Sequence, residues 1–334
     1  MTDSLISTNK KVIILLGPTG VGKTGAALLL AKKIDTEIIS ADSMQIYRHM
    51  DIGTAKPSRE ERAFVTHHMI DIVHPWENFS TGRYISMIVP VIEDLHKRGK
   101  IPVVVGGTGL YIKAMTRGIF SGPSADWTLR EELLSMEKEE AGSLYAYLKK
   151  LDPGAAERIT PNDTRRVIRA LEVYLKGHES ISEMQQRLTH PLPYDFIKIG
   201  LSKDRKELYR IIEERVDKMI QHGLMNEVKM VIDMIQERLL SHHPSPITHD
   251  PLSMPHYPFP SLQAIGYKEV SMCLQGEISP DETVSLIKRA TKRYAKRQFT
   301  WFKKEENIHW VDITGVSESN EAFLSVWRIL ENLL

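Results

Sequence analysis

One segment of the sequence has residue types and spacing that suit phosphate binding. Residues 17–24 read GPTGVGKT and match the phosphate-loop pattern G-x-x-x-x-G-K-[ST]. In this pattern glycines let backbone N–H groups converge on phosphate oxygens, the lysine supplies a positive charge, and the last hydroxyl can hold Mg²⁺. The pattern leaves open which phosphate ester is bound. The predicted phosphate-binding residues are Gly17, Pro18, Thr19, Gly20, Val21, Gly22, Lys23 and Thr24, with Thr24 also as the Mg²⁺ ligand.

Two further segments place polar groups directly after apolar, strand-like runs. Asp42 follows the run EIIS at 37–40, and the turn GGTG with Thr108 follows PVVV at 102–105. A carboxylate in such a position can bind Mg²⁺ or accept a proton, and it can equally cap a turn, so this segment alone leaves both interpretations open. The second strand end carries no aspartate. Its absence disfavours ATP phosphoryl transfer, in which an aspartate after an apolar strand usually holds the metal.

These groups meet only if a sheet presents them at one edge. The apolar run 11–16 leads into the phosphate loop and is followed by helical spacing at 22–34, while 196–201 predicts another strand and 81–98 a helix capped by Ser80. The alternation predicts an α/β fold, a P-loop NTPase-like parallel sheet flanked by helices. Strand-like runs are absent between about 124 and 194. We therefore predict a core of residues 1–123 and 195–334, interrupted by an all-helical insertion domain at 124–194.

Composition sets limits on location and partners. The net charge of +1 does not by itself indicate a polyanionic partner, and the single cysteine, Cys273, cannot form an intrachain disulfide. The N-terminus lacks a secretory pattern and no apolar run reaches membrane-spanning length, so we expect a cytoplasmic protein without membrane contact. The segment 241–260 is rich in Pro and His but has no fixed ligand spacing; we interpret it as a surface loop rather than a metal site. Its histidines are His242, His243, His249 and His256.

A basic segment near the C-terminus is a candidate RNA-binding surface. Residues 288–304 hold eight Lys or Arg and no acidic residue. On a helix, Arg289, Arg293 and Arg297 share one side with Lys296, opposite Tyr294 and Trp301. The pattern fits contact with RNA phosphates, and it also fits a solvated helix face above a packed aromatic stripe; we favour phosphate contact.

Several segments, in order along nearly the whole chain, resemble the tRNA dimethylallyltransferase family (tRNA isopentenyltransferases). The resemblance implies transfer of a dimethylallyl group from dimethylallyl diphosphate to N6 of the adenosine at tRNA position 37, with Mg²⁺ as cofactor. The sequence departs from the family's pattern at Gly20-Val21, where Ala-Ser is common in the family. Its segment 241–260 is also longer than we expect for the family. The matching segments are GPTGVGKT, SADSMQIYRHMDIGTAKP, HHMIDI, VGGTGLYI, NDTRRVIRALEVY, LYRIIEERVDKMIQHGLMNEV, LQAIGYKE and RYAKRQFTWF.

The resemblance also implies roles for individual residues. Lys23, Asp42 and Thr108 would be catalytic, with Asp42 accepting a proton from the adenine amino group, and Arg215 would be a second cation on the diphosphate. The partner is then the anticodon stem-loop of tRNA, and we expect a monomer. The residues expected to contact tRNA, besides the three arginines of the basic segment, are Asp42, Ser43, Met44, Gln45, Thr108, Arg130, Arg165, Arg166, Val167, Ile168 and Arg169.

Three other functions fit parts of the sequence. A small-molecule P-loop kinase would share the strand, loop and helix and an arginine-rich helical lid. A prenyltransferase acting on free AMP would share the chemistry, but it needs neither a basic helix nor a large insertion. A non-catalytic RNA-binding protein would leave Asp42 and the GGTG turn without a role.

Overall fold

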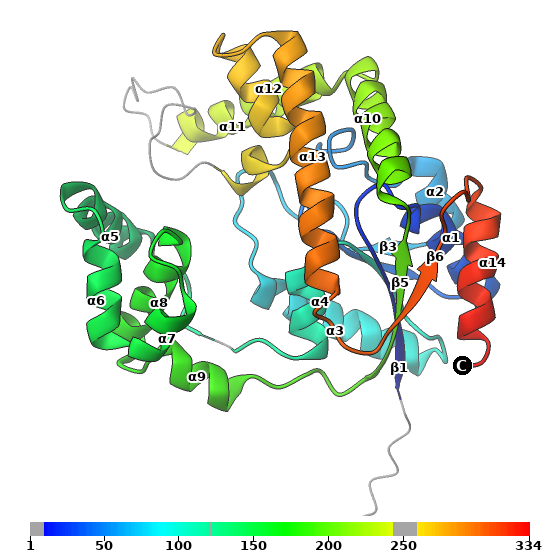
Figure 1. Ribbon diagram of the computed structural model, residues 1–334, viewed down its shortest axis with the longest axis horizontal. Coiled ribbons are helices and arrows are strands. Elements are labelled where there is room, and N and C mark those ends of the chain that lie inside the picture. Colours follow the sequence, from blue (N-terminus) through cyan, green and yellow to red (C-terminus); the bar gives the residue numbers. More distant parts are fainter. Residues whose placement is uncertain (1–9, 121, 243–258) are drawn as a thin grey trace, which may run out of the picture. The chain divides into compact units, whose positions relative to one another are not determined.

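The structure, a computed structural model, describes residues 10–120, 122–242 and 259–334 (Figure 1). The chain divides into two compact units, a core unit of Met1–Ile112 with Pro193–Leu334 and a helical unit of Lys113–Leu192. The helical unit begins at Lys113, within the helix α4 (Gly109–Thr116) and eleven residues before the predicted start at 124. Phe120 joins the apolar core of this unit, and Arg169 donates a hydrogen bond to the carbonyl of Pro123.

The core unit is built on a six-stranded sheet in which every pairing is parallel, as predicted. The strand order is β3-β2-β4-β1-β5-β6. Predicted strands at 11–16, 37–40, 102–105 and 196–201 all exist, with ends shifted by one residue at most, whereas β3 and β6 were not predicted. The strands are β1 (Lys11–Leu16), β2 (Ile38–Ala41), β3 (His67–His68), β4 (Val103–Gly106), β5 (Asp195–Ser202) and β6 (Ile308–Asp312).

The register of the sheet brings the polar segments together. Leu16 of β1 and Ala41 of β2 both pair with Gly106, the last residue of β4. The segments that follow these residues therefore leave the sheet side by side at its carboxyl edge, where parallel sheets bind ligands. These segments are the phosphate loop, the turn at Asp42 and the glycine turn at Gly107.

Helices of the core unit cover the sheet and extend beyond its carboxyl edge. α1 packs against the sheet together with α14, and α10 packs along α13 (Figure 1). The predicted Ser80 cap of α3 is present, because Ser80 Oγ accepts from the N–H of Arg83. The helices are α1 (Lys23–Lys33), α2 (Arg59–Phe64), α3 (Thr81–Lys97), α4 (Gly109–Thr116), α10 (Arg205–Gln221), α11 (Leu224–His242), α12 (Tyr267–Leu274), α13 (Pro280–Phe302) and α14 (Ser319–Leu330), with a 3-10 turn at Pro260–Gln263.

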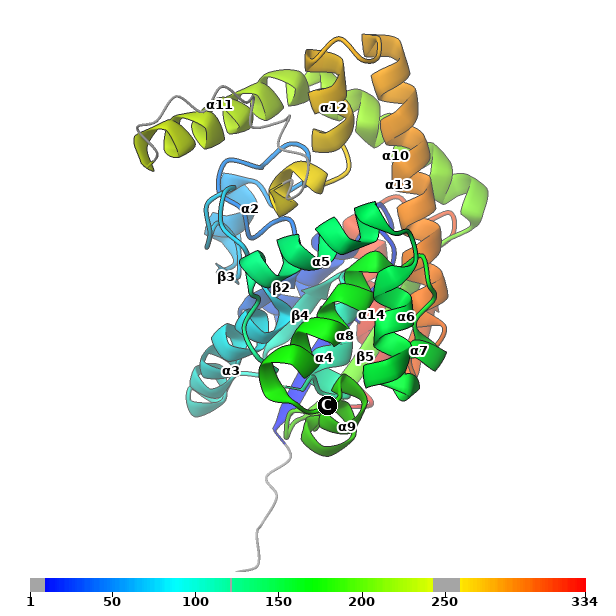
Figure 2. The same cartoon turned by 90° about the vertical axis from the view of Figure 1, so that its left-hand side faces the viewer.

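The helical unit is built from helices and connecting segments. Its described residues form no strand, and α5, α6 and α8 lie together around one apolar core (Figure 2). Leu148, Val167 and Leu171 are buried there. The helices are α5 (Trp127–Glu139), α6 (Ser143–Leu151), α7 (Pro153–Arg158), α8 (Thr164–Gly177) and α9 (Ile181–Leu188).

Two predictions about surface features have different outcomes. Within the described ranges, no helix combines the length and apolar character needed to cross a bilayer. The Pro/His-rich segment lies almost entirely at 243–258, outside the described residues, so its interpretation as a loop stays a prediction.

Candidate active site

The phosphate loop connects β1 to the first turn of α1. Gly22 precedes the helix with a φ of +105°, a conformation that favours glycine, and α1 begins at Lys23. Lys23 Nζ donates to the carbonyls of Gly17 and Pro18, both at 2.9 Å. The loop lines a cavity of about 400 Å³, into which Thr24, Gly107 and Asp42 also face. The geometry provides a helix N-terminus and a lysine for an anion.

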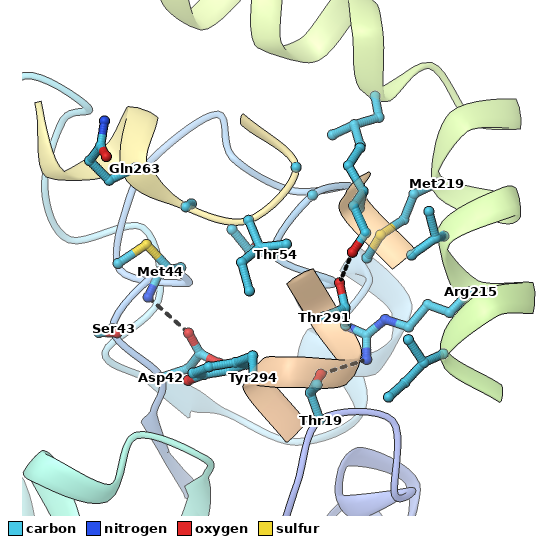
Figure 3. Close-up of a pocket in the computed structure, with 18 of the residues that line it drawn as sticks. Thr19, Asp42, Ser43, Met44, Thr54, Arg215, Met219, Gln263, Thr291 and Tyr294 are labelled. Atoms are coloured by element: carbon cyan, nitrogen blue, oxygen red, sulfur yellow. Dashed lines mark hydrogen bonds between the residues drawn. The ribbon is translucent and has the colours of Figure 1, made fainter. Parts of the chain in front are cut away.

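Two half-buried cations line this cavity. Burial lowers the pKa of the Lys23 amine from 10.5 to about 7; the carboxylate of Asp42 opposes the shift and the guanidinium of Arg215 adds to it. Burial also lowers the pKa of Arg215, again against the effect of Asp42. Arg215 reaches from α10 towards the loop, where its Nη1 lies 3.4 Å from Thr19 Oγ1 (Figure 3). An anionic ligand would relieve the cost of burying both charges.

Asp42 caps a turn, which is one of the two interpretations that the sequence left open; its role as a metal ligand or proton acceptor stays a prediction. Its Oδ1 accepts from the N–H groups of Met44, at 2.8 Å, and Gln45, at 3.3 Å, so it caps the turn after β2. The same side chain faces two cavities and is therefore available to a ligand. Thr108 lies next to this turn, because the N–H of Ser43 donates to its Oγ1 at 3.0 Å. The structure thus brings the predicted catalytic residues Lys23, Asp42 and Thr108 to one edge of the sheet.

A second cavity, of about 280 Å³, adjoins the first one. Its wall on α10 and α13 is largely apolar and includes Ile212, Val216, Met219 and Ile287. Ser43 and Met44 also line this cavity, whereas Gln45 lines the first. Residues shared by both cavities mark their junction (Figure 3), and these are Thr19, Asp42, Thr54, Arg215 and Tyr294.

Three residues of this region were not found from the sequence. Tyr294 on α13 stands beside Asp42 at the junction, and burial raises the pKa of its hydroxyl (Figure 3). Gln298, one turn further along α13, lines the first cavity and is only 6% exposed. Thr54 belongs to a loop that Glu227 holds, since the N–H groups at 51–53 donate to its carboxylate at 2.7–2.9 Å. Tyr294 and Gln298 could have been found as the inward side of the basic helix, but no local signal indicates Glu227.

The predicted basic surface is present on α13. Arg289, Arg293 and Arg297 are exposed, and Arg297 also lines the apolar-walled cavity. The opposite side is less uniform than predicted, because Trp301 remains 39% exposed although it packs against Gly109.

The helical unit holds part of the predicted RNA-contact set. Arg165 and Arg166 are exposed at the start of α8. Val167 and Ile168 are only 1% and 5% exposed, and they face the apolar core of the unit. Their side chains are therefore not exposed to RNA, because the opposite faces of a helix point in opposite directions, and the predicted contacts of these two residues stay untested.

Arg130 and Arg169 are also bound within the helical unit. Arg130 donates to both oxygens of the buried Glu172, at 2.9 and 2.8 Å, and Arg169 pairs with the same carboxylate. Burial raises the pKa of Glu172, but hydrogen bonds from Arg130, the N–H of Asp126 and Arg169 outweigh burial and hold the pKa below its ordinary value. Both arginines therefore support the fold of this unit, and predicting them as RNA contacts overlooked a buried carboxylate 42 residues from Arg130.

Comparison with known proteins assigns this architecture to a family. Residues 45–305 match the family model described as IPP transferase. The chain belongs to the IPP transferase family. It is accordingly a prenyltransferase, which decides against the kinase and against a non-catalytic protein. It is 58% identical to a tRNA dimethylallyltransferase of Thermodesulfovibrio yellowstonii, over 97% of this chain and 99% of that relative.

Solved structures give the same result for the fold. A tRNA isopentenylpyrophosphate transferase from Bacillus halodurans superposes with a TM-score of 0.68 at 38% identity, covering 97% of this chain and 96% of that one. A eukaryotic dimethylallyltransferase, described as acting on tRNA, has a TM-score of 0.77 at 30% identity, with 97% and 80% covered. The parallel sheet flanked by helices is therefore that of the transferases.

Proposed function

We propose that this enzyme transfers the dimethylallyl group of dimethylallyl diphosphate to N6 of adenosine 37 in tRNA and releases diphosphate. The observation that carries the proposal is the convergence of Lys23, Arg215 and Asp42 on the cavity of the phosphate loop, where Arg215 and Asp42 also line the second cavity. The names of relatives support the acceptor, since they are called tRNA dimethylallyltransferases and one solved structure is described as acting on tRNA.

The two cavities suit the two parts of the donor. Diphosphate would lie in the cavity of loop 17–24, bound by loop amides, Lys23 and Arg215. The five-carbon group would extend towards the apolar wall formed by Ile212, Val216 and Met219. When the allylic C–O bond breaks, its electron pair leaves with the diphosphate, and the buried cations stabilise the negative charge that builds there.

The site suits Mg²⁺ bound together with the diphosphate. Thr24 faces the cavity, and the described residues hold no group of three or more His, Cys, Asp or Glu that could bind a metal alone. Mg²⁺ commonly keeps few protein ligands and takes the rest from phosphate oxygens and water. The Thr24 hydroxyl would hold the ion, which would neutralise charge on the leaving diphosphate.

Asp42 is placed to complete the transfer at the acceptor. The lone pair of N6 forms the new bond to the allylic carbon, and the proton then lost from N6 passes to the Asp42 carboxylate. Its turn-capping hydrogen bonds, from Met44 and Gln45, fix the carboxylate at the junction. Thr108, held against the same turn by Ser43, would position the base.

The acceptor base must leave its stack to reach this junction, at a cost of a few kcal/mol that contacts elsewhere offset. Exposed cations on each unit can bind the RNA backbone, namely Arg289, Arg293 and Arg297 on α13 and Arg165 and Arg166 on α8. Ser43, Met44 and Gln45 border the cavities and would contact the flipped nucleotide or its neighbours. We propose that a monomer performs the reaction.

A label-transfer assay tests this function. The enzyme is incubated with dimethylallyl diphosphate labelled in the prenyl group, Mg²⁺, and an unmodified anticodon stem-loop; a stem-loop with guanosine at position 37 is the matched control. Label should enter the first RNA and not the control. Label in free AMP without label in the stem-loop would select the mononucleotide prenyltransferase, and label in neither acceptor would contradict the proposal.

A further inference from the structure

Gln298 bridges two of the three segments that form the diphosphate cavity. Its Oε1 accepts from the N–H of Thr19 at 2.8 Å, and its Nε2 donates to the carbonyl of Gly107 at 2.9 Å. Thr19 belongs to the phosphate loop and Gly107 to the turn after β4, 88 residues apart in sequence. Gln298 itself lines the cavity and is almost completely buried.

The bridge requires a side-chain amide of this length. A Cβ at position 107 would lie 2.2 Å from Gln298 Nε2, so the glycine leaves room for the amide and for little else. An aliphatic side chain would leave the N–H of Thr19 and the carbonyl of Gly107 without these partners. A carboxylate could accept from Thr19 but could not donate to Gly107 unless it were protonated.

Gln298 also connects both segments to the helix with the basic surface. On α13 it follows directly after Arg297, which is exposed, and lies one turn from Tyr294, which stands at the junction of the cavities. α13 is a helix of 23 residues with a capped start, where Ser279 Oγ accepts from the N–H of Glu282. The buried side of α13 thus fixes the loop that holds the donor.

We infer that Gln298 is a positioning residue whose amide holds the phosphate loop and the glycine turn at the spacing that the donor diphosphate requires. The inference rests on the proposed function, in which loop 17–24 binds this diphosphate. Gln298 acts through Thr19 and Gly107 and takes no part in bond making. Its loss should therefore affect binding of the donor and leave binding of the RNA unchanged.

Two variants of Gln298 and one control separate positioning from general stability. Gln298→Met removes both hydrogen bonds, and Gln298→Glu keeps the shape and the acceptor. Thr283→Val is the control; Thr283 is buried on the same helix, donates to the carbonyl of Ser279, and lines neither cavity. Isothermal titration measures the Kd of dimethylallyl diphosphate with Mg²⁺ between pH 5.5 and 8, thermal unfolding measures stability, and filter binding measures the Kd of the stem-loop.

Both Gln298 variants should raise the donor Kd about tenfold or more at pH 8, with the stem-loop Kd within about twofold of wild type. For Gln298→Glu the ratio to wild type should fall towards one as pH decreases, since a protonated glutamate can again donate to Gly107. Thr283→Val should leave the donor Kd within about twofold even where its melting temperature is lower.

Two results would overturn the inference. One is a donor Kd within about twofold of wild type in both Gln298 variants; the other is an equal weakening in Thr283→Val at matched stability. If the wild-type enzyme binds neither dimethylallyl diphosphate nor inorganic pyrophosphate, the proposed function fails as well. If the wild type and both Gln298 variants bind the donor equally well, only the inference about Gln298 fails.

Discussion

The core unit and the helical unit both bury charged side chains, but they balance the charge in different ways. In the helical unit Glu172 is fully buried, and two arginines and a backbone N–H satisfy its carboxylate. In the core unit the hydrogen-bond partners of Lys23 and Arg215 are neutral oxygens, those of Gly17, Pro18 and Thr19. The carboxylate of Asp42 acts on both cations from nearby but offsets only part of the effect of burial.

The pKa shifts express this difference. Paired arginines hold the pKa of Glu172 below its ordinary value despite burial, whereas burial dominates at Lys23 and lowers its pKa to about 7. Removing a buried charge whose partners are complete leaves those partners unpaired, which is costly for the fold. A half-buried cation that is only partly compensated is stabilised when an anion binds, which is typical of a functional site.

The largest expected effect comes from Asp42, the carboxylate that moderates both buried cations. Asp42→Asn keeps an Oδ1 that can cap the turn to Met44 and Gln45 but removes the proton acceptor. We expect the single-turnover rate of prenyl transfer to fall by about 10²- to 10⁴-fold, with the stem-loop Kd unchanged. Rapid-quench measurement with labelled donor checks the rate. If Asp42→Asn transferred the prenyl group at the wild-type rate, Asp42 would have no part in the mechanism.

Arg215 should show the next largest effect. Arg215→Leu removes a buried cation and its contact with Thr19, so the KM for dimethylallyl diphosphate should rise about 10- to 100-fold. The melting temperature should not fall, because the charge that is removed was desolvated. Arg210→Leu is the matched control on α10, since Arg210 is exposed and pairs with Glu214; it should change neither quantity. A large loss of stability in Arg215→Leu would make this arginine a structural residue.

Glu172 should behave in the opposite way. Glu172→Gln weakens the hydrogen bonds to Arg130 and Arg169, so the free energy of unfolding should fall by about 1–3 kcal/mol while the single-turnover rate stays near wild type. Because the folded-state pKa of Glu172 is lowered, its stabilisation is present above the unfolded pKa and is lost as pH falls below it. Chemical denaturation should show the two proteins converging at acidic pH. A variant that is stable yet inactive would contradict the structural role.

The smallest effect is expected on the surface of α13, where lysines in ion pairs can be compared with arginines that have no ion pair among the described residues. Replacing Arg293 and Arg297 by alanine should weaken stem-loop binding and reduce the slope of log K against log salt by about 1.4–1.8, as for two phosphate contacts. Lys288 and Lys292 pair with Asp217 and Glu213 of α10, so their replacement should change the slope less. Equal slopes for the two double variants would leave the arginines as solvated surface residues.

Sequence patterns predicted the parts of this molecule that local chemistry determines. The strands before the phosphate loop, Asp42 and the GGTG turn are short, mainly apolar runs, and Ser80 is a strong helix cap. The strand β3 was missed because only two residues pair, and β6 because its residues are mostly exposed or half-buried.

The rest depends on contacts between distant segments. Gln298 meets Thr19 across 279 residues and Glu227 meets Ile52 across 175, so neither contact has a local signal. The burial of Val167 and Ile168 was missed for a different reason. The helical period over residues 164–177 places Val167 and Ile168 on the same side of α8 as Leu171. Applying this period to the sequence would have assigned both residues to the core.

Proton uptake on donor binding tests the central claim most directly. Lys23 has a pKa of about 7 in the free enzyme, and a bound diphosphate should raise it, so Lys23 should take up a proton when the donor binds at pH 8. Titration calorimetry in buffers of different ionisation enthalpy should show an uptake of about one proton by wild type and almost none by Lys23→Arg, whose charge does not titrate near this pH. The donor affinity of wild type should correspondingly decrease as pH rises above 7. Equal proton uptake by both proteins would contradict the claim that Lys23 gains a proton when the diphosphate binds at the phosphate loop.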